Sequence, residues 1–133
     1  MSVAIVTGSS GLVGSETARF LVEQGLDVVG IDNNMRAYFF GSDGSTDWNA
    51  KELKRTLRRY THVPSDVRDQ TAVDELFQKY GKAISAVIHC AAQPSHDWAA
   101  KEPITDFGVN ALATIFLLEA TRRFAPEAAF VFT

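Results

Sequence analysis

The chain contains 133 residues, of which 46% are hydrophobic and 22% are charged, and its formal net charge at pH 7 is −3. This composition predicts one globular domain over residues 1–133, and the acidic balance argues against a nucleic-acid partner. The single cysteine, Cys90, excludes an intramolecular disulfide and fits a reducing cytoplasm. No apolar run approaches the roughly 20 residues of a membrane-spanning helix, and no signal peptide is recognisable, so we expect a cytoplasmic protein without a membrane partner.

The first predicted elements are a strand over Val3–Thr7 and a helix over 12–24, separated by a glycine-rich turn. Gly25 follows the helix as a residue that ends it. A second apolar strand ends at Asp32. Three apolar side chains of the helix are expected to face the core: Val13, Phe20 and Leu21.

A long loop is predicted over 33–47. Its three consecutive aromatic residues, Tyr38 to Phe40, either pin the loop, which is the interpretation we prefer, or line a nucleotide site. A helix and a short strand over Tyr60–Val63 follow. The helix is expected to carry five basic residues on one face: Lys51, Lys54, Arg55, Arg58 and Arg59. Such a stripe is usually a solvated surface, and we prefer that interpretation to a nucleic-acid site.

Predicted helices and strands continue to alternate to the end of the chain. Asp69 caps a helix that Gly81 ends, and a fourth strand follows over Ala86–His89. A long helix is predicted after Pro103, and Phe130–Phe132 begin a fifth strand. The pattern predicts an α/β fold of the Rossmann type: a doubly wound parallel sheet in the order 3-2-1-4-5 between two helical layers, truncated after the fifth strand.

Three glycines in the turn after the first strand, Gly8, Gly11 and Gly14, are the strongest functional signal in the sequence. The first permits a tight turn, the second lets a pyrophosphate approach the backbone, and the third lets the helix pack against the strand. The start of the helix adds free N–H groups and a positive dipole end. With Asp32 at the end of the next strand, the pattern predicts a dinucleotide-binding site.

Asp32 bears on the choice between NAD and NADP. A carboxylate here accepts hydrogen bonds from the adenosine ribose and repels a 2′-phosphate, which favours NAD; the alternative is a solvated carboxylate at a strand end. Arg36 instead favours NADP, because a nearby arginine accommodates the 2′-phosphate. We predict NAD, because Asn33 and Asn34 follow Asp32 directly and carry no positive charge.

The spacing TGxxGxxG resembles the short-chain dehydrogenase/reductase superfamily, and the resemblance covers the whole chain. It implies that Asp66 and Val67 contact the adenine, that the small residues of His89–Ala92 lie against the cofactor, and that Asn110 lies near the site. Together, the motif and the resemblance give these cofactor-binding residues: Gly8, Ser10, Gly11, Leu12, Val13, Gly14, Asp32, Asn33, Asn34, Arg36, Asp66, Val67, Ala91, Ala92, Gln93 and Asn110.

Two segments, Asp32–Gly41 and Ala92–Ala99, resemble the extended nucleotide-sugar epimerases and among them the CDP-paratose 2-epimerases. The resemblance implies tightly held NAD, transient oxidation of a CDP-deoxysugar at carbon 2, and return of the hydride to the opposite face. It places Gln93, Ser95 and His96 where they face the nicotinamide and the sugar substrate, although His96 is equally well an ordinary polar loop residue. The histidines lack metal-ligand spacing, so no metal is expected.

The superfamily's chemistry needs a tyrosine base followed four residues later by a lysine that lowers its pKa. The residues four positions after Tyr38, Tyr60 and Tyr80 are Ser42, Pro64 and Ile84. We therefore expect no catalytic residue in this chain. The sequence is interpreted as the amino-terminal, cofactor-binding part of a longer epimerase, and this part alone is expected to bind NAD without turnover.

Other functions remain open. They are a nucleotide-sugar dehydratase, another epimerase of the same superfamily, or a non-enzymatic dinucleotide-binding module, because a fold alone does not fix function. The full protein is expected to bind a nucleotide sugar and to form a homo-oligomer. In this chain, Phe130–Phe132 would form an apolar sheet edge, and such an edge favours self-association.

Overall fold

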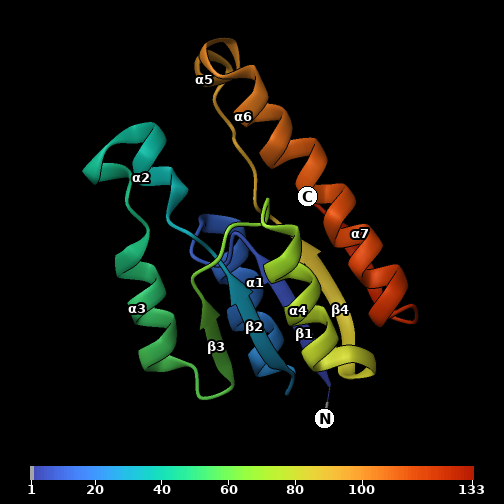
Figure 1. The fold of residues 1–133 in the computed structure, drawn as a ribbon. Helices are drawn as coiled ribbons and strands as arrows, with labels where there is room; N and C mark the ends of the chain where they lie inside the picture. Colours follow the sequence, from blue (N-terminus) through green and yellow to red (C-terminus); the bar gives the residue numbers. More distant parts are fainter. Residues whose placement is uncertain (1) are drawn as a thin grey trace.

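A five-stranded, all-parallel sheet forms the centre of the computed structural model, which describes residues 2–133 (Figure 1). The strand order is β3-β2-β1-β4-β5, as the sequence predicts. The strands are β1 (Val3–Thr7), β2 (Asp27–Ile31), β3 (Tyr60–Val63), β4 (Ile84–His89) and β5 (Ala129–Phe132). The order reverses direction between β1 and β4, where α/β proteins of this kind bind their ligands.

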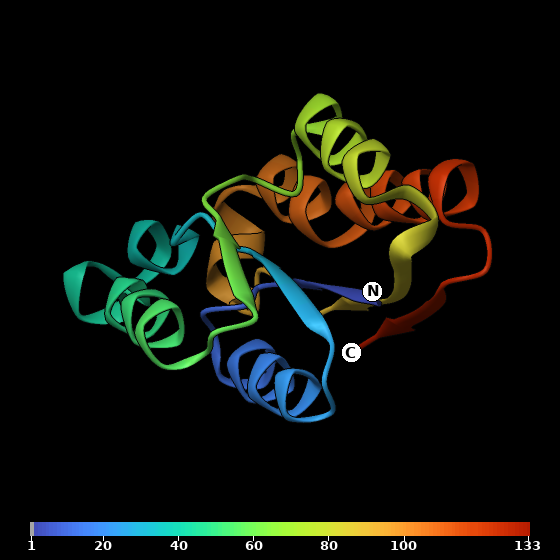
Figure 2. The ribbon, with the colours of Figure 1, turned by 90° about the horizontal axis from the view of Figure 1, so that it is seen from below.

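Helices cover both faces of the sheet and give the predicted three layers (Figure 2). They are α1 (Leu12–Glu23), α2 (Met35–Phe40), α3 (Asp47–Thr56), α4 (Gln70–Tyr80), α5 (His96–Lys101), α6 (Pro103–Phe107) and α7 (Ala113–Phe124), with short 3-10 turns at Ser42–Gly44 and Gly81–Ala83. α1 and α3 lie on one face and α4 and α7 on the other, whereas α2 and α5 stand beyond the carboxyl ends of the strands.

Two apolar cores follow from the alternation of side chains along the strands. Ile5 faces α4 and α7 and packs with Phe77 and Leu117, whereas its neighbours Ala4 and Val6 face α1 and α3. All five residues of β1 are buried, as in a strand covered on both faces. Because the core encloses β1 so completely, the turn that leaves its carboxyl end has a fixed starting point.

Register aligns the strand ends that carry the predicted site. Thr7 pairs with Ile31 of β2 on one side and with His89 of β4 on the other. The turn after β1 and the loops after β2 and β4 therefore begin at the same edge of the sheet. This alignment brings segments more than 80 residues apart in sequence to one place.

The predicted loop over 33–47 is wrong in part, because it contains α2 and a 3-10 turn. Asn34 has a left-handed conformation (φ 56°), which starts α2 abruptly after β2. Helix α5 is likewise absent from the sequence-based prediction. Both helices have six residues, too few for an apolar period to be recognised.

Helix α1 packs differently from the prediction. Val13 and Phe20 are 53% and 58% exposed, and the buried side of the helix carries the small residues Gly14, Ser15 and Ala18 instead. Small residues let the helix axis approach the sheet closely, so larger apolar side chains have no room beneath it. Leu21 does pack against the core, as expected.

The five basic residues near α3 do not share one helical face. The helix ends at Thr56, so Arg58 and Arg59 lie beyond it, and the Arg59 guanidinium donates to the carbonyl of Gly25. Arg55 pairs with Glu52 on the same helix. The structure thus contradicts the predicted single basic face.

The long helix predicted after Pro103 consists of α6, a π-helical turn at Gly108–Leu112, and α7. By length and composition, Pro103–Phe124 would be long and apolar enough to cross a membrane, contrary to the expectation from sequence. Its inner face, with Ala113, Leu117 and Ala120, packs in the core. A core helix of a soluble protein meets the same criterion, so the length and composition of this helix are weak evidence for a membrane span.

Candidate functional site

The glycine-rich turn between β1 and α1 has the geometry that the motif predicts. Gly8 has a φ of +63°, and a Cβ there would lie 2.8 Å from the backbone nitrogen of Ala91. A Cβ on Gly14 would lie 2.1 Å from the Gly8 carbonyl oxygen. Any side chain at either position would collide with backbone, so both glycines are required by packing. Gly11 is less crowded, with 3.3 Å to the Gly8 carbonyl oxygen.

Backbone donors without an intrahelical partner lie at the start of α1. The first intrahelical bond of α1 runs from the Ser15 N–H to the Gly11 carbonyl, at 2.9 Å. The N–H groups of Leu12, Val13 and Gly14 precede it and therefore have no partner within the helix. Gly11 supplies no side-chain cap, and the first turn contains no acidic residue. These donors and the helix dipole form a site for a negatively charged group such as a phosphate.

The carboxylate of Asp32, at the end of β2, is fixed by two backbone donors. Oδ2 accepts a hydrogen bond from the N–H of Ser10 at 3.0 Å, and Oδ1 accepts one from the N–H of Asn34 at 2.8 Å. An ionised carboxylate has about four acceptor positions, so Asp32 retains capacity for two hydroxyl donors. This is the capacity that ribose recognition needs.

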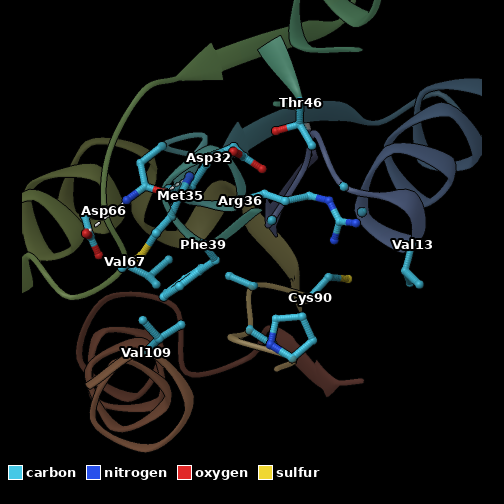
Figure 3. A pocket seen from close by; sticks show the side chains of 18 of the residues that line it. Val13, Asp32, Met35, Arg36, Phe39, Thr46, Asp66, Val67, Cys90 and Val109 are labelled. Carbon is cyan, nitrogen blue, oxygen red and sulfur yellow. Dashed lines mark hydrogen bonds between the residues drawn. The ribbon is translucent and has the colours of Figure 1, made fainter. Parts of the chain in front are cut away.

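A pocket of about 260 Å³ joins the turn, the end of β2 and the loop after β4 (Figure 3). It lies at the point where the strand order reverses. The pocket brings together most of the predicted cofactor-binding residues: Gly8, Gly11, Leu12, Val13, Gly14, Asp32, Asn33, Arg36, Asp66, Val67, Ala91 and Ala92.

Four residues of α2 line this pocket, namely Met35, Arg36, Phe39 and Phe40, and Figure 3 labels the first three. Arg36 forms no ion pair within residues 2–133, and its guanidinium lies 4.9 Å from the centre of the Phe40 ring. Phe39 is almost fully buried and shares the pocket wall with Val67 and Val109. The pocket therefore combines an apolar wall with one unneutralised positive charge, which suits a base and a phosphate.

Asp66 lines the pocket, but its carboxylate is already occupied. Arg68 donates to it through Nε and Nη2, the latter at 2.7 Å, and the Asn33 amide donates at 3.0 Å. Burial raises the pKa of this carboxyl, but the hydrogen bonds and charge of Arg68 outweigh it, so the pKa lies below its usual value. An adenine amino group is a further donor, so contact with it would need Asp66 to release one of these hydrogen bonds.

The remaining predicted residues lie outside the pocket wall and stabilise the loops around it. The side-chain oxygen of Asn34 accepts a hydrogen bond from the N–H of Thr46 at 2.8 Å and so joins the two ends of the 34–46 segment. Asn110, in the π-helical turn, accepts from the Gln93 N–H at 2.8 Å and donates to its carbonyl at 3.1 Å. Ser10 also lies behind the wall, and its buried hydroxyl has no partner within residues 2–133.

The three residues predicted to face a substrate differ in accessibility. Gln93 is 5% exposed, and its amide donates to Asp106 and to the Ser95 carbonyl, both at 2.9 Å. Ser95 accepts from the Trp98 N–H and caps α5. His96 is exposed at the first position of α5. Only His96 among them has a side chain directed into solvent.

His89 forms a polar bridge behind the site. Its Nδ1 lies 2.7 Å from Thr7 Oγ1, and its Nε2 lies 3.0 Å from Thr114 Oγ1. Thr114 donates to the Asn110 carbonyl and Thr7 accepts from the Ala91 N–H. The Thr114 hydrogen is used by the Asn110 carbonyl, so Nε2 must donate to Thr114, and in the neutral ring Nδ1 then accepts from the Thr7 hydroxyl. Burial lowers the pKa of His89 to about 4.

Phe39 and Phe40 line the pocket, which the sequence offers as one of two roles for the aromatic cluster. Several other pocket residues are missing from the sequence-based prediction: Ile31, Met35, Thr46, Ser65, Cys90, Pro94 and Val109. Ser65 and Cys90 could have been predicted from the sequence, because Ser65 lies just beyond the end of β3 and Cys90 immediately follows β4. Met35 could be placed only after α2 was known. Val109 carries no local signal, since it is an apolar residue within a helix.

Comparison with known proteins places this site in a family. A model described as "NAD dependent epimerase/dehydratase family" matches residues 4–133, nearly the whole chain. The chain belongs to this family. The family-level prediction from the sequence is therefore confirmed, and so is NAD as the cofactor of the family.

Curated relatives of this epimerase/dehydratase chain include more than one enzyme. A CDP-paratose 2-epimerase of Salmonella typhi is 32% identical over 120 residues, which are 90% of this chain and 32% of that protein. A UDP-glucose 4-epimerase of Mus musculus is 34% identical over 122 residues, 92% of this chain and 34% of that protein. The chain thus spans about a third of the length of these relatives.

Solved structures of epimerases have the same fold. A UDP-glucose-4-epimerase from Stenotrophomonas maltophila, crystallised with NAD and formylated UDP-arabinopyranose, has a TM-score of 0.77 and 30% identity, covering 99% of this chain and 36% of that one. A UDP-glucose 4-epimerase of Thermus thermophilus in complex with NAD has a TM-score of 0.70 and 29% identity, covering 93% and 34%.

The residues of this epimerase/dehydratase chain fit a dinucleotide. The turn leaves three backbone donors at the start of α1, and side chains at Gly8 and Gly14 would destroy its shape. Asp32 retains acceptors, and Arg36 retains its charge. Residues 2–133 contain no group of three or more His, Cys, Asp or Glu that could hold a metal ion.

Proposed function

We propose that this chain is the NAD-binding part of a nucleotide-sugar epimerase that inverts carbon 2 of a CDP-deoxysugar. The observation that supports NAD binding most strongly is the coupling of the turn to Asp32, because one hydrogen bond joins the phosphate-binding and ribose-binding groups. The choice of sugar depends on Asp32–Gly41 and Ala92–Ala99, which resemble the CDP-paratose 2-epimerases. An enzyme of this kind, from Salmonella typhi, is among the relatives of the chain at 32% identity.

Each group of residues has a defined task in the proposed binding. The N–H groups of Leu12, Val13 and Gly14 hold the pyrophosphate, and Arg36, which lines the same pocket, adds a positive charge. Asp32 accepts hydrogen bonds from the adenosine ribose, and Val67 borders the adenine. When bound, NAD accepts a hydride from the sugar and returns it.

The carboxyl-terminal residues of a longer protein would supply the catalytic acid and base. This chain contains no tyrosine followed four positions later by lysine. We therefore propose that the 133-residue chain binds NAD but does not epimerise a sugar. Gln93, Ser95 and His96 would border the sugar. Of these three residues His96 is the exposed one, so its ring is free to contact the sugar.

A second candidate function is epimerisation of a UDP-sugar at carbon 4. The UDP-glucose 4-epimerase of Mus musculus matches this chain as closely, at 34% identity, as the CDP-paratose enzyme does. Both candidates use the same cofactor site. The two candidate functions are distinguished by assaying the longer protein with CDP-paratose and with UDP-glucose and identifying the product by NMR.

Calorimetric titration of the chain with NAD tests the proposal. We expect saturable binding by the wild type and at least tenfold weaker binding by Gly11→Val, because the added side chain occupies the space of the pyrophosphate. Ala100→Val, at an exposed position of α5 outside the pocket wall, is the control for an added apolar side chain. A folded wild type that binds no NAD would contradict the proposal.

A further inference from the structure

The back of the glycine-rich turn is held by residues that do not line the pocket. Ser9 is fully buried, and its Oγ lies 2.9 Å from the phenolic oxygen of Tyr60. Tyr60 begins β3, which is separated from β1 by β2. Its hydroxyl therefore reaches across a whole strand to contact the turn.

Gly30 of β2 makes this contact possible. A Cβ on Gly30 would lie 2.3 Å from the Tyr60 hydroxyl oxygen and 2.5 Å from Ser9 Oγ. The hydroxyl pair thus occupies the space that any side chain at position 30 would fill. Glycine weakens strands in general, but it is required at position 30 because the Tyr60 and Ser9 hydroxyls approach the backbone of β2 closely.

A second anchor reaches the next residue of the turn from α3. The Asn49 amide donates to the carbonyl of Ser10 at 2.9 Å, and Asn49 is 6% exposed. The N–H of Ser10 donates to Asp32. Three elements, β2, β3 and α3, therefore hold two successive residues of the turn, immediately before the N–H groups of α1.

We infer that Tyr60 and Asn49 are positioning residues for the dinucleotide: they fix the turn so that the α1 donors are aimed before the cofactor arrives. This inference rests on the proposed NAD binding. Neither residue lines the pocket, so neither is a direct contact. A pre-organised site avoids the entropic cost of ordering its donors upon binding, so loss of an anchor weakens binding without removing any cofactor contact.

Tyr60 is suited to this role because it remains neutral. Burial raises the pKa of its hydroxyl, the Ser9 hydrogen bond lowers it, and the negative charge of Asp32 raises it further, so the pKa stays above its usual value. His62 Nδ1 lies 3.4 Å from the same oxygen, at the long limit for a hydrogen bond. The Ser9 contact is therefore the stronger of the two.

Tyr60→Phe tests the inference, because it removes only the hydroxyl. Amide hydrogen exchange of the NAD-free protein should become at least threefold faster at Ser10 and Gly11, whereas β1 amides should keep their rates. NAD binding, corrected for the folded fraction, should weaken roughly three- to tenfold, as expected for one buried hydrogen bond. Tyr80→Phe is the matched control, since Tyr80 packs on the opposite core.

Asn49→Ala provides an independent test with the same two measurements. We expect faster exchange in the turn and weaker NAD binding again. If both variants lose global stability but bind NAD as tightly as the wild type per folded molecule, the anchors are merely structural and the inference is wrong.

The outcomes distinguish this inference from the proposed function. A folded wild type that binds no NAD contradicts the proposed function and removes the role of the anchors with it. A wild type that binds NAD, together with Tyr60→Phe and Asn49→Ala variants that bind it equally well, contradicts the inference alone. Faster turn exchange combined with weaker binding supports both.

Discussion

Asp32 Oδ2 accepts a hydrogen bond of 3.0 Å from the backbone N–H of Ser10, so the end of β2 and the turn after β1 form one rigid unit. The groups proposed to bind the ribose and the pyrophosphate are therefore not independent. Their relative position is set by a side chain whose two oxygens already accept one backbone donor each. We therefore expect substitutions at Asp32 and Gly14, and changes in the protonation of His89, to have distinct effects on binding and stability.

Asp32→Asn is expected to reduce the preference for NAD over NADP by about tenfold, which corresponds to roughly 1.4 kcal/mol. The amide has one acceptor oxygen and keeps only one of the two backbone hydrogen bonds, which weakens binding of both dinucleotides. Their ratio changes because the negative charge that repels a 2′-phosphate is gone. Dissociation constants for both dinucleotides measure the ratio. Asp69→Asn, which changes a helix-capping carboxylate away from the pocket, should leave the ratio unchanged.

Gly14→Ala is expected to destabilise the fold as well as the site. The added Cβ would lie 2.1 Å from the Gly8 carbonyl oxygen, which is backbone and cannot rotate away. Either α1 moves away from β1 or the turn opens, at a cost of about 1–3 kcal/mol, as for other overpacked positions. Urea unfolding measures this change. A Gly14→Ala variant as stable as the wild type would show that α1 does not pack as closely as described.

His89 is expected to make the stability of the protein depend on pH. Its pKa falls from 6.5 in the unfolded chain to about 4 in the fold, because burial disfavours the charged ring. Between these values the unfolded chain binds a proton that the folded protein does not. The free energy of unfolding therefore decreases by up to about 3 kcal/mol as the pH falls from 6.5 to 4.

Denaturant unfolding of wild type and His89→Asn across this pH range separates the histidine from other titrating groups. The variant should lack the part of the slope that His89 contributes, while the carboxylates and His62 act equally in both proteins. Parallel stability curves would contradict the neutral bridge between Thr7 and Thr114.

The exposed edge at β5 is expected to cause self-association of this chain. Val131 and Phe132 are 45% and 65% exposed on the outermost strand. Phe132→Glu should therefore shift sedimentation toward the monomer at high protein concentration. Phe20→Glu serves as the control, since Phe20 is 58% exposed on α1, away from that edge. A wild type that is an ideal monomer would remove the basis for this prediction.

The fold was predictable because its signals are local and repeated. Val3–Thr7 and Gln70–Tyr80 follow from apolar periodicity, from the cap at Asp69 and from the Gly81 stop. The strand order follows from the handedness of parallel connections and was confirmed. The inward face of α1 was not predictable in the same way, because the close packing of Gly14 and Ala18 against the sheet depends on tertiary distance.

The site was predictable where the motif specifies backbone shape. Gly8, Gly11 and Asp32 line one pocket, as expected. Sequence reasoning could not reveal that Asp66 is occupied by Arg68, or that Asn110 binds the Gln93 backbone instead of lining the pocket. Those contacts depend on side-chain directions that residue spacing does not determine.

The most direct test of the central claim is a pair of equilibrium titrations of the wild-type chain, one with NAD and one with NADP. We expect NAD to bind and NADP to bind at least tenfold more weakly, because the proposed ribose contact of Asp32 would place its negative charge beside the extra phosphate. Equal affinities, or tighter binding of NADP, would mean that Arg36 determines the choice and would contradict the role assigned to Asp32.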